Sequence, residues 1–390
     1  MKTGGALVAI GALVVPATFG QDTFSDATSV VIVEVPVRVQ VGGVPLRGLT
    51  AEDFELRDEG ERRTITGFEV VDFGFEHLGA DFTEPAPVPI RKATRNYLFF
   101  IDLAWGGGDP ISARRRLEES IGSLRGVVAR KVSASDRVAI GYFSAVRGVK
   151  LLLGFTDERQ EIYRAIDALD LVVRSKPRQL ERDFRDWKEL PPPRRGARAK
   201  TARGPIRPSL EDLVAEARQS SFRGDINLPH SSLVMYMTRG LRLISRNTRL
   251  VGEKHLVLLS AGPLYGGEGA RSQRFIQELF RDFRQQNWAI EAINTAGLGF
   301  GRDSLRYLAD GTGGQLYANT WDIESLLDDM FDKTSVSYIL VFQLYDPPAV
   351  GTYRKLKVEL KDAPEKTEIV HRPGYYVGRA RSRIPGVDPR

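Results

Sequence analysis

The chain has 390 residues, no cysteine and a formal net charge of +6. Its length is enough for two domains, and 42% hydrophobic with 27% charged residues is typical of a folded globular protein rather than a disordered or fibrous one. The absence of cysteine excludes disulfides, thiolate nucleophiles and zinc–thiolate sites.

Residues 1–20 have the features of a secretory signal peptide. Lys2 precedes an apolar run from Ala6 to Val15, which is too short to span a membrane comfortably. A disordered apolar tail is the alternative. We expect export, to the periplasm, the envelope or the exterior, with no transmembrane span after signal removal. For an exported protein we expect no nucleic acid as partner, despite the positive charge, but an anionic envelope surface or an acidic protein.

Residues 21–73 are predicted to form the first part of a small β-domain. Valine recurs at alternate positions from Val33 to Val41, which is the period of a strand, and Pro36 favours an edge position or a bulge. Thr50 and Asp53 have the spacing of a capping box that starts one short turn. Further strand patterns follow, and we find no catalytic constellation in this region.

Residues 74–94, with several prolines, are predicted to be a linker to a larger α/β domain at 95–335. Strand and helix patterns alternate in this domain, which favours a parallel sheet with helices on both faces. Its first strand, from Tyr97, ends at Asp102 and runs into a glycine loop before a long helix. Ligands of doubly wound sheets bind beyond the carboxyl ends of such strands, so a site is expected at Asp102.

The alternation stops at residues 171–225, an insertion rich in arginine and lysine. A loop of this length is either a solvated excursion or functional, and the functional interpretation is a contact arm for an acidic partner. Residues 336–378 return to β patterning, and 379–390 are left as a tail. We expect the strands of 336–378 to pair with those of 21–73, giving a smaller β-sandwich-like domain built from both chain ends.

The α/β region resembles a von Willebrand factor type A (VWA) domain. The motifs that carry the resemblance occur in that family's order: Asp102, Asp136–Ser144, Val257–Gly262 and Leu308–Gly314. The wider chain resembles bacterial exported proteins with a VWA-related domain, through flanking segments at Leu49–Leu56, Tyr338–Leu340, Gly351–Val358 and Arg372–Tyr376. The resemblance covers nearly everything after residue 20 except the basic insertion. It implies a doubly wound, mostly parallel sheet.

In VWA domains a strand-end loop, Asp-x-Ser-x-Ser, holds a divalent cation together with a Thr and a second Asp from neighbouring loops, and the cation bridges to an acidic group of the partner. The resemblance places these positions on residues that mostly lack an oxygen ligand: Asp102, Ala104 and Gly106 for the loop, Ala261 between Ser260 and Gly262 for the second acid, and Ser231 or Ser232 for the threonine. Two hydroxyls and one carboxylate are therefore missing.

We accordingly expect no cofactor at this degenerate metal-ion-dependent adhesion site (MIDAS), with Mg²⁺ or Ca²⁺ binding as the minor alternative. Asp109 could reach the loop, but just before Pro110 it is better placed to cap the helix. Asp102 is then expected to organise the loop as an acceptor for backbone amides.

No other pattern indicates an enzyme. The sequence has no P-loop and no Gly-x-Ser-x-Gly elbow, and the glycines of Gly297–Gly301 miss the dinucleotide fingerprint by one residue. None of the four histidines is placed to activate Ser260 or has metal-ligand spacing. Trp105, beside the glycine loop, suits either a binding hot spot or packing on the loop.

We therefore predict a non-enzymatic, exported protein-binding module of the adhesion type. Its rim around Asp102, Trp105 and Gly262 would contact a protein partner without a metal ion. The alternatives are a metal-dependent adhesion domain with a reduced ligand set, and an exported enzyme with an unrecognised site.

Overall fold

The structure is a computed structural model, and it describes residues 29–73, 94–104, 110–144, 148–174, 230–262, 269–297, 301–318, 320–378 and 381–382. Side chains are not described for 110–114, 171–174, 230–231, 269–271 and 381–382. The predicted signal peptide, nearly all of the predicted linker and most of the basic insertion lie outside these residues. So do three predicted site residues, Trp105, Gly106 and Asp109.

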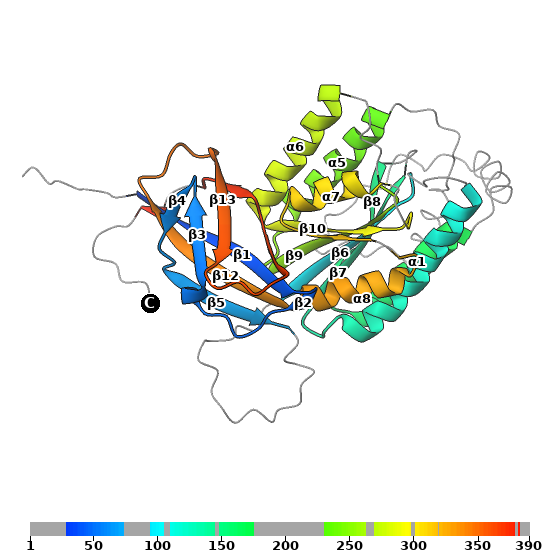
Figure 1. Cartoon of the computed structure of the whole chain (residues 1–390). Helices are drawn as coiled ribbons and strands as arrows, with labels where there is room; N and C mark the ends of the chain where they lie inside the picture. The colour runs from blue at the N-terminus through cyan, green and yellow to red at the C-terminus, as the bar shows by residue number, and fades with distance from the viewer. Residues whose placement is uncertain are drawn as a thin grey trace, which may run out of the picture.

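A six-stranded sheet forms the centre of the described part of 95–335, with the strand order β11-β10-β9-β6-β7-β8 (Figure 1). The neighbours along β11, β10, β9, β6 and β7 run parallel, and β8 is an antiparallel edge strand that pairs with β7. The mixed α/β fold expected from the alternating patterns is confirmed. The strands are β6 (Arg95–Asp102), β7 (Arg137–Ser144), β8 (Gly148–Thr156), β9 (Glu253–Ser260), β10 (Trp288–Asn294) and β11 (Leu316–Tyr317).

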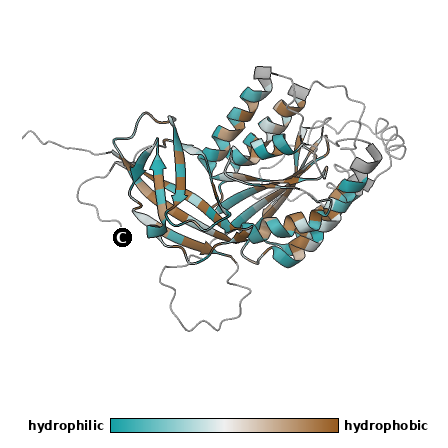
Figure 2. Cartoon of the chain, in the orientation of Figure 1, coloured by the Kyte–Doolittle hydropathy of each residue, from teal (hydrophilic) through white to brown (hydrophobic). Residues whose placement is uncertain are grey.

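Helices cover both faces of this sheet. One buried cluster joins the sheet to α1, α2 and α8, and a second joins its other face to α5, α6 and α7. Since both faces are covered, β6 is buried along its whole length, and Figure 2 shows the hydrophobic colour concentrated on the central strands. The helices are α1 (Pro110–Lys131), α2 (Arg159–Arg174), α5 (His230–Asn247), α6 (Gly269–Gln286), α7 (Arg302–Asp310) and α8 (Ile323–Lys333).

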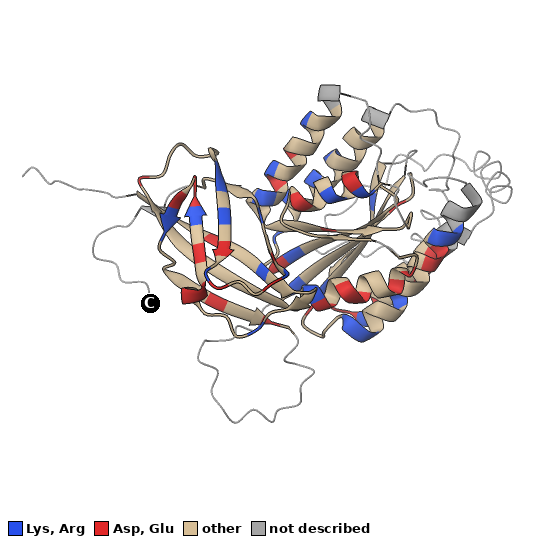
Figure 3. Ribbon diagram, in the orientation of Figure 1, with Lys and Arg blue, Asp and Glu red and all other residues tan. Residues whose placement is uncertain are grey.

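Ion pairs on the surface join the end of α1 to α8, and Figure 3 shows basic (blue) and acidic (red) positions on the ribbons of these two helices. Arg130 pairs with Glu324 at 2.6 Å and with Asp328 at 3.1 Å, and Lys131 pairs with Asp332 at 2.6 Å. Because these side chains are exposed, each pair contributes little stability, and their effect is to orient one helix on the other.

Strands from both ends of the chain form a second, all-β unit. β1 pairs antiparallel with β12 over eight residues, from Val30 opposite Tyr345 to Val37 opposite Tyr338. Alternate valines of β1, from Val31 to Val39, are buried between this sheet and a second one, which explains the period of two in the sequence. The first sheet has the order β14-β1-β12-β5, with β2 and β16 also paired to β1, and the second has the order β15-β13-β3-β4.

The bounds of these elements differ in two places from the sequence patterns. The last part of the β pattern at 336–378, residues 368–377, is divided between two strands in different sheets, because Pro373 lacks the amide hydrogen that a continuing ladder needs. Part of the expected tail, Arg381–Ser382, pairs with the start of β1. The elements are β1 (Ser29–Val41), β2 (Val44–Pro45), the turn η1 (Ala51–Asp53), β3 (Phe54–Asp58), β4 (Glu61–Arg63), β5 (Gly67–Asp72), β12 (Val336–Tyr345), β13 (Tyr353–Leu360), β14 (Thr367–His371), β15 (Gly374–Tyr376) and β16 (Arg381–Ser382).

Candidate functional site

The strand order places the first candidate site at the carboxyl ends of β6 and β9. These neighbouring strands are the first and fourth of the sheet along the chain, so the order of strands reverses between them. Such a switch point is where ligands bind in open α/β sheets. Asp102 is the last residue of β6 and Ser260 is the last residue of β9.

Both oxygens of the Asp102 carboxylate accept hydrogen bonds. Oδ1 accepts from the amide of Ala104 at 2.9 Å, and Oδ2 accepts from the hydroxyl of Ser260 at 2.6 Å. The Ser260 hydroxyl in turn accepts from the amide of Gly262 at 3.0 Å. Asp102 is only 4% exposed and Ser260 is fully buried. The acid therefore connects the loop after β6 to the loop after β9 from beneath the surface.

The loop after β9 is held by a close approach of two glycines. Gly262 has φ +92°, and a Cβ on it would lie 2.5 Å from Cα of Gly301, just before α7. Gly301 has φ +69°, and a Cβ there would lie 1.9 Å from the carbonyl oxygen of Ala261. Side chains other than hydrogen are excluded from both positions, so the two loops meet through their backbones.

The structure brings five of the predicted site residues together: Asp102, Ala104, Ser260, Ala261 and Gly262. Ala261 is 3% exposed, so its side chain packs beneath the loop after β9 and gives almost no surface for a partner to contact. Ala104 is half-buried against the cluster under α5, α6 and α7. Ser232, near the start of α5, is half-buried and is not hydrogen-bonded to Asp102 or Ser260 in the described structure, while the side chain of Ser231 is not described.

Trp321 is an exposed aromatic residue on the same face that sequence reasoning missed. It lies between β11 and α8, is 55% exposed, and its ring rests on Gly297 after β10, where a Cβ would lie 2.4 Å from the ring. The guanidinium of Arg116 lies 5.7 Å from the ring centroid. The signal that pointed to Trp105, a tryptophan between a strand and a helix, also applies to Trp321.

The described residues at this face do not fit a divalent cation. Mg²⁺ and Ca²⁺ need six or more oxygen ligands, and here a single carboxylate has hydrogen bonds on both oxygens while Ala104 and Ala261 provide none. Within the described ranges no cluster of three or more His, Asp or Glu side chains is arranged to hold a metal. The described part of this face offers backbone, hydroxyl and aromatic groups.

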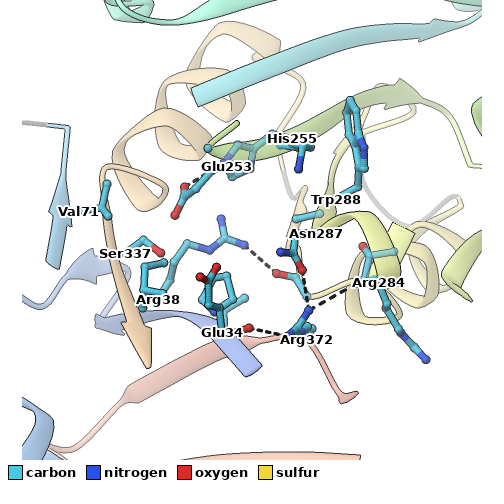
Figure 4. A pocket seen from close by; sticks show the side chains of 18 of the residues that line it. Glu34, Arg38, Val71, Glu253, His255, Arg284, Asn287, Trp288, Ser337 and Arg372 are labelled. Atoms are coloured by element: carbon cyan, nitrogen blue, oxygen red, sulfur yellow. Dashed lines mark hydrogen bonds and ion pairs between the residues drawn. The ribbon is translucent and has the colours of Figure 1, made fainter. Parts of the chain in front are cut away.

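A second candidate site lies at the opposite, amino-terminal edge of the parallel sheet. A cavity of about 490 Å³ opens there between the α/β unit and the β1–β12 sheet (Figure 4). Polar side chains from both units line it, among them Arg38, Glu253, His255, Arg284, Ser337 and Arg372. Nothing in the sequence patterns pointed to this cavity, because its walls come from segments more than 200 positions apart.

A buried ionic cluster lies beside the cavity and joins the two units. Nη1 of Arg38 lies 2.8 Å from Oε1 of Glu291, without a hydrogen-bonding angle, and Nη2 donates to the carbonyl of Gly313 at 3.1 Å. His255 lies between two carboxylates, 3.2 Å from Glu291 and 3.3 Å from Glu253. The pairing between units therefore depends on charges that are almost completely removed from water.

The surroundings of this cluster shift its pKa values in the direction of ionisation. Burial opposes charge on Glu291, but the charge of Arg38 and the bonds from His255 lower its pKa to about 2. Burial likewise opposes charge on His255, but the bonds from Glu253 and Glu291 raise its pKa above the ordinary value of 6.5. Burial works against Glu253 as well, and the bond from His255 lowers its pKa. Opposite charges in contact thus outweigh desolvation.

The fold and these two sites define an α/β protein with an attached β unit, and comparison with known proteins adds structural likenesses only. No protein-family model and no curated protein matches the sequence. No helix in the described residues is long and apolar enough to cross a membrane.

Three solved structures illustrate the similarity. Proximal thread matrix protein 1 from the mussel byssus is 15% identical, with a TM-score of 0.33, over 65% of this chain and 48% of that one. An aerotolerance-related membrane protein from Bacteroides fragilis is 8% identical, with a TM-score of 0.31, over 61% and 97%. BatB from Bacteroides thetaiotaomicron is 8% identical, with a TM-score of 0.30, over 61% and 98%. The chain spans about half the length of the mussel protein.

Proposed function

We propose that residues 95–335 form a VWA-like domain that works as a non-enzymatic protein-binding module of an exported protein. The order of its motifs supports this assignment, as does the mostly parallel sheet with Asp102 at its switch point. The contact surface is the rim formed by the loops after β6, β9, β10 and β11. The β unit built from both chain ends supports the domain from the opposite edge of the sheet.

The observation that carries the proposal is the bonding of Asp102. Both oxygens of Asp102 accept hydrogen bonds from the two loops, so each oxygen has a lone pair engaged in holding the rim. Ser260, whose hydroxyl donates to Asp102, is fully buried, which does not favour it as a nucleophile because a nucleophile must reach its substrate. This bonding supports a structural role for Asp102 beneath a rim that binds its partner through shape and surface, without a metal ion.

Trp321 is the described residue best suited to anchor a partner on this rim. Tryptophan and arginine are the residue types that contribute most at protein interfaces, and Trp321 is half-exposed with Arg116 over its ring. Its support by the Gly297 backbone holds the ring in place before binding, which lowers the entropic cost of association. Trp105 remains a predicted contact on the same rim.

Site-specific photocrosslinking tests this proposal. A benzoyl-phenylalanine in place of Trp321 should form an adduct with a partner in native envelope preparations. The matched control is the same group in place of Tyr345, an exposed aromatic residue on the β unit. A discrete adduct from position 321 alone is expected, with loss of partner binding in Trp321→Ala. Equal adducts from both positions would show that the rim is not the contact surface.

Export is tested separately on the mature chain. We expect the protein in the periplasmic, envelope or extracellular fraction, with a processed amino terminus close to residue 21. A cytoplasmic protein that retains Lys2 would contradict the proposed localisation.

The basic insertion, 171–225, is proposed as a second contact for an acidic partner, and deletion of residues 175–225 should weaken binding in a salt-dependent way.

A further inference from the structure

We propose that the cavity at the amino-terminal edge of the parallel sheet binds a small organic acid that carries a hydroxyl or amino group besides its carboxylate. This site lies at the other end of the sheet from the rim and does not depend on the rim's function. Its volume of about 490 Å³ is within the range of small-molecule pockets, roughly 300–1,000 Å³. The chemical class follows from the polar groups that line it.

Arg372 provides the main anchor for an anion. Its Nη1 donates to Oδ1 of Asn287 at 2.6 Å and to the carbonyl of Arg284 at 3.4 Å, and its Nη2 donates to the carbonyl of Glu34. All these acceptors are neutral, and no carboxylate among the described residues forms an ion pair with it. Its Nε is buried without a hydrogen-bond partner. An arginine has five donors, so Nε and one hydrogen of Nη2 remain for a ligand.

The electrostatics of Arg372 favour an anionic ligand. Burial lowers its pKa to about 10, and the nearby charge of Arg284 adds to this effect, whereas Tyr375 and Glu34 oppose it only in part. A guanidinium is normally charged far above this pH, so the surrounding residues compensate its charge poorly. A carboxylate against Nε would supply the compensation.

The balance of the other charges on the cavity wall also favours an anion. Arg38 is matched by Glu291, and Glu253 is matched by His255. Lys254 donates to the carbonyl of Gln286 at 2.9 Å and Arg284 donates to the carbonyl of Gly311 at 2.7 Å, again neutral acceptors. With Arg372 they give three cations, against the carboxylates of Glu34 and Glu69 on the same wall.

Glu253 supplies the second recognition group. Its Oε2 contacts His255, and its Oε1 is buried and makes no hydrogen bond of normal geometry in the described structure, although the Ser337 side chain lies close enough to help lower the pKa of Glu253. An unsatisfied buried acceptor is costly, and a ligand hydroxyl or ammonium would satisfy it. Figure 4 shows the side chains of Glu253, Arg38 and Arg372 around the space between the two units. One anionic group and one donor on the same small ligand match this pair of open positions.

Calorimetry with simple probes tests the assignment. L-malate is expected to bind at one site per chain, and succinate, which lacks the hydroxyl, is expected to bind about tenfold more weakly. Inorganic phosphate should bind more weakly than L-malate, because its donor and its charge sit on one phosphorus, whereas L-malate carries its hydroxyl and its carboxylates on different carbons. Absence of a saturable signal with L-malate, or tighter binding of phosphate than of L-malate, would overturn the proposal.

Variants locate the binding in the cavity. Val251 lies at the mouth and is 76% exposed, so Val251→Trp should block entry without disturbing the core, and it should abolish L-malate binding. Arg372→Gln should weaken L-malate and succinate alike, by tenfold or more. Glu253→Gln should weaken L-malate and leave succinate unchanged. Arg62→Gln, at an exposed arginine of β4, is the matched control and should bind as the wild type does. Unchanged binding by Val251→Trp would place the ligand elsewhere.

Discussion

The hydroxyl of Ser260 donates a hydrogen bond of 2.6 Å to the carboxylate of Asp102, across 158 positions of sequence. This bond joins the ends of β6 and β9, the neighbouring strands at the switch point of the sheet. Because Ser260 also accepts from the amide of Gly262, one acid fixes the backbone of two rim loops. A carboxylate position typical of cation binding is thus used to hold the loops that we propose as a binding surface.

The first prediction concerns the stability that Asp102 provides. Asp102→Ala leaves the amide of Ala104 and the hydroxyl of Ser260 buried without an acceptor, so we expect the free energy of unfolding to fall by about 2–4 kcal/mol. Urea denaturation measures the change. Asp362→Ala, at an exposed turn residue, is the control and should change stability by less than about 0.5 kcal/mol. Equal effects of the two substitutions would mean that the bonds of Asp102 do not hold the loops.

The second prediction concerns divalent cations. A cation at one hundred times its Kd would stabilise the fold by about 2.7 kcal/mol, so binding would raise the melting temperature visibly. We expect the same melting temperature in Mg²⁺, in Ca²⁺ and in chelator, because the described ligands at Asp102 are too few. Calorimetric melting curves measure the melting temperature under the three conditions. A stabilisation by Mg²⁺ that disappears in Asp102→Ala would show a working cation site.

The third prediction compares a glycine that has no room for a side chain, Gly262, with one that has room, Gly122. Gly262→Ala places a Cβ 2.5 Å from Gly301 at a positive φ, and we expect a loss of about 2 kcal/mol or more. Gly122→Ala, within α1, meets no atom within 4 Å and should gain about 0.5–1 kcal/mol from the higher helix propensity of alanine. Thermal unfolding of both variants measures the difference. A well-tolerated Gly262→Ala would show that the loops can separate without cost.

The same contact limits the use of Gly262 variants as a test of the rim. Any side chain at Gly262 would meet the Gly301 backbone, so loss of binding in such a variant would report a disrupted loop. Trp321→Ala removes surface without this clash and is the cleaner test of the rim.

The fourth prediction concerns pH and the cluster between the two units. The pKa of His255 is raised in the folded state, so its contribution to stability is complete below its ordinary value of 6.5 and is lost as the pH rises through the folded value. The pKa of Glu291 is lowered to about 2, so its contribution is present above 4.5 and is lost as the pH falls toward 2. The cluster should therefore stabilise the protein most between about pH 4.5 and 6.5.

His255→Gln tests this pH dependence. The difference in unfolding free energy between wild type and His255→Gln should be largest near pH 6 and should shrink at higher pH. His371→Gln is the control with the opposite sign, because burial lowers the pKa of His371, so its contribution is lost as the pH falls through its folded pKa. Parallel pH profiles for the two variants would rule out the proposed charge state of the cluster.

The elements of the fold could be predicted because their signals are local. Alternate valines predicted β1, and the first strand of the α/β domain was correctly predicted to end at Asp102, with a long helix, α1, after it. The β pattern did not reveal the break in the chain at Pro373, which separates β14 from β15. A period of two or of 3.6 residues identifies an element, but it carries no information about the strand that pairs with it.

The candidate site could be predicted only in part. The sequence placed Asp102 and Ser260 at strand ends, and the missing oxygens at Ala104 and Ala261 were visible in it. The sequence could not show that Asp102 and Ser260 bond to each other, because that contact depends on β6 and β9 being neighbours. The overlooked Trp321 shows the same limit, since its exposure depends on its packing against Gly297.

The sequence by itself determined the alternation of elements, the absence of cysteine chemistry and the residue types at each strand end, because these are properties of composition and local period. Only the tertiary structure decided that both oxygens of the Asp102 carboxylate accept hydrogen bonds and that a charged cavity opens at the amino-terminal edge of the parallel sheet. The physical reason is that burial and hydrogen bonding between distant segments exist only after the sheets have assembled. Arg38 and Glu291 acquire their strong coupling only when both are removed from water.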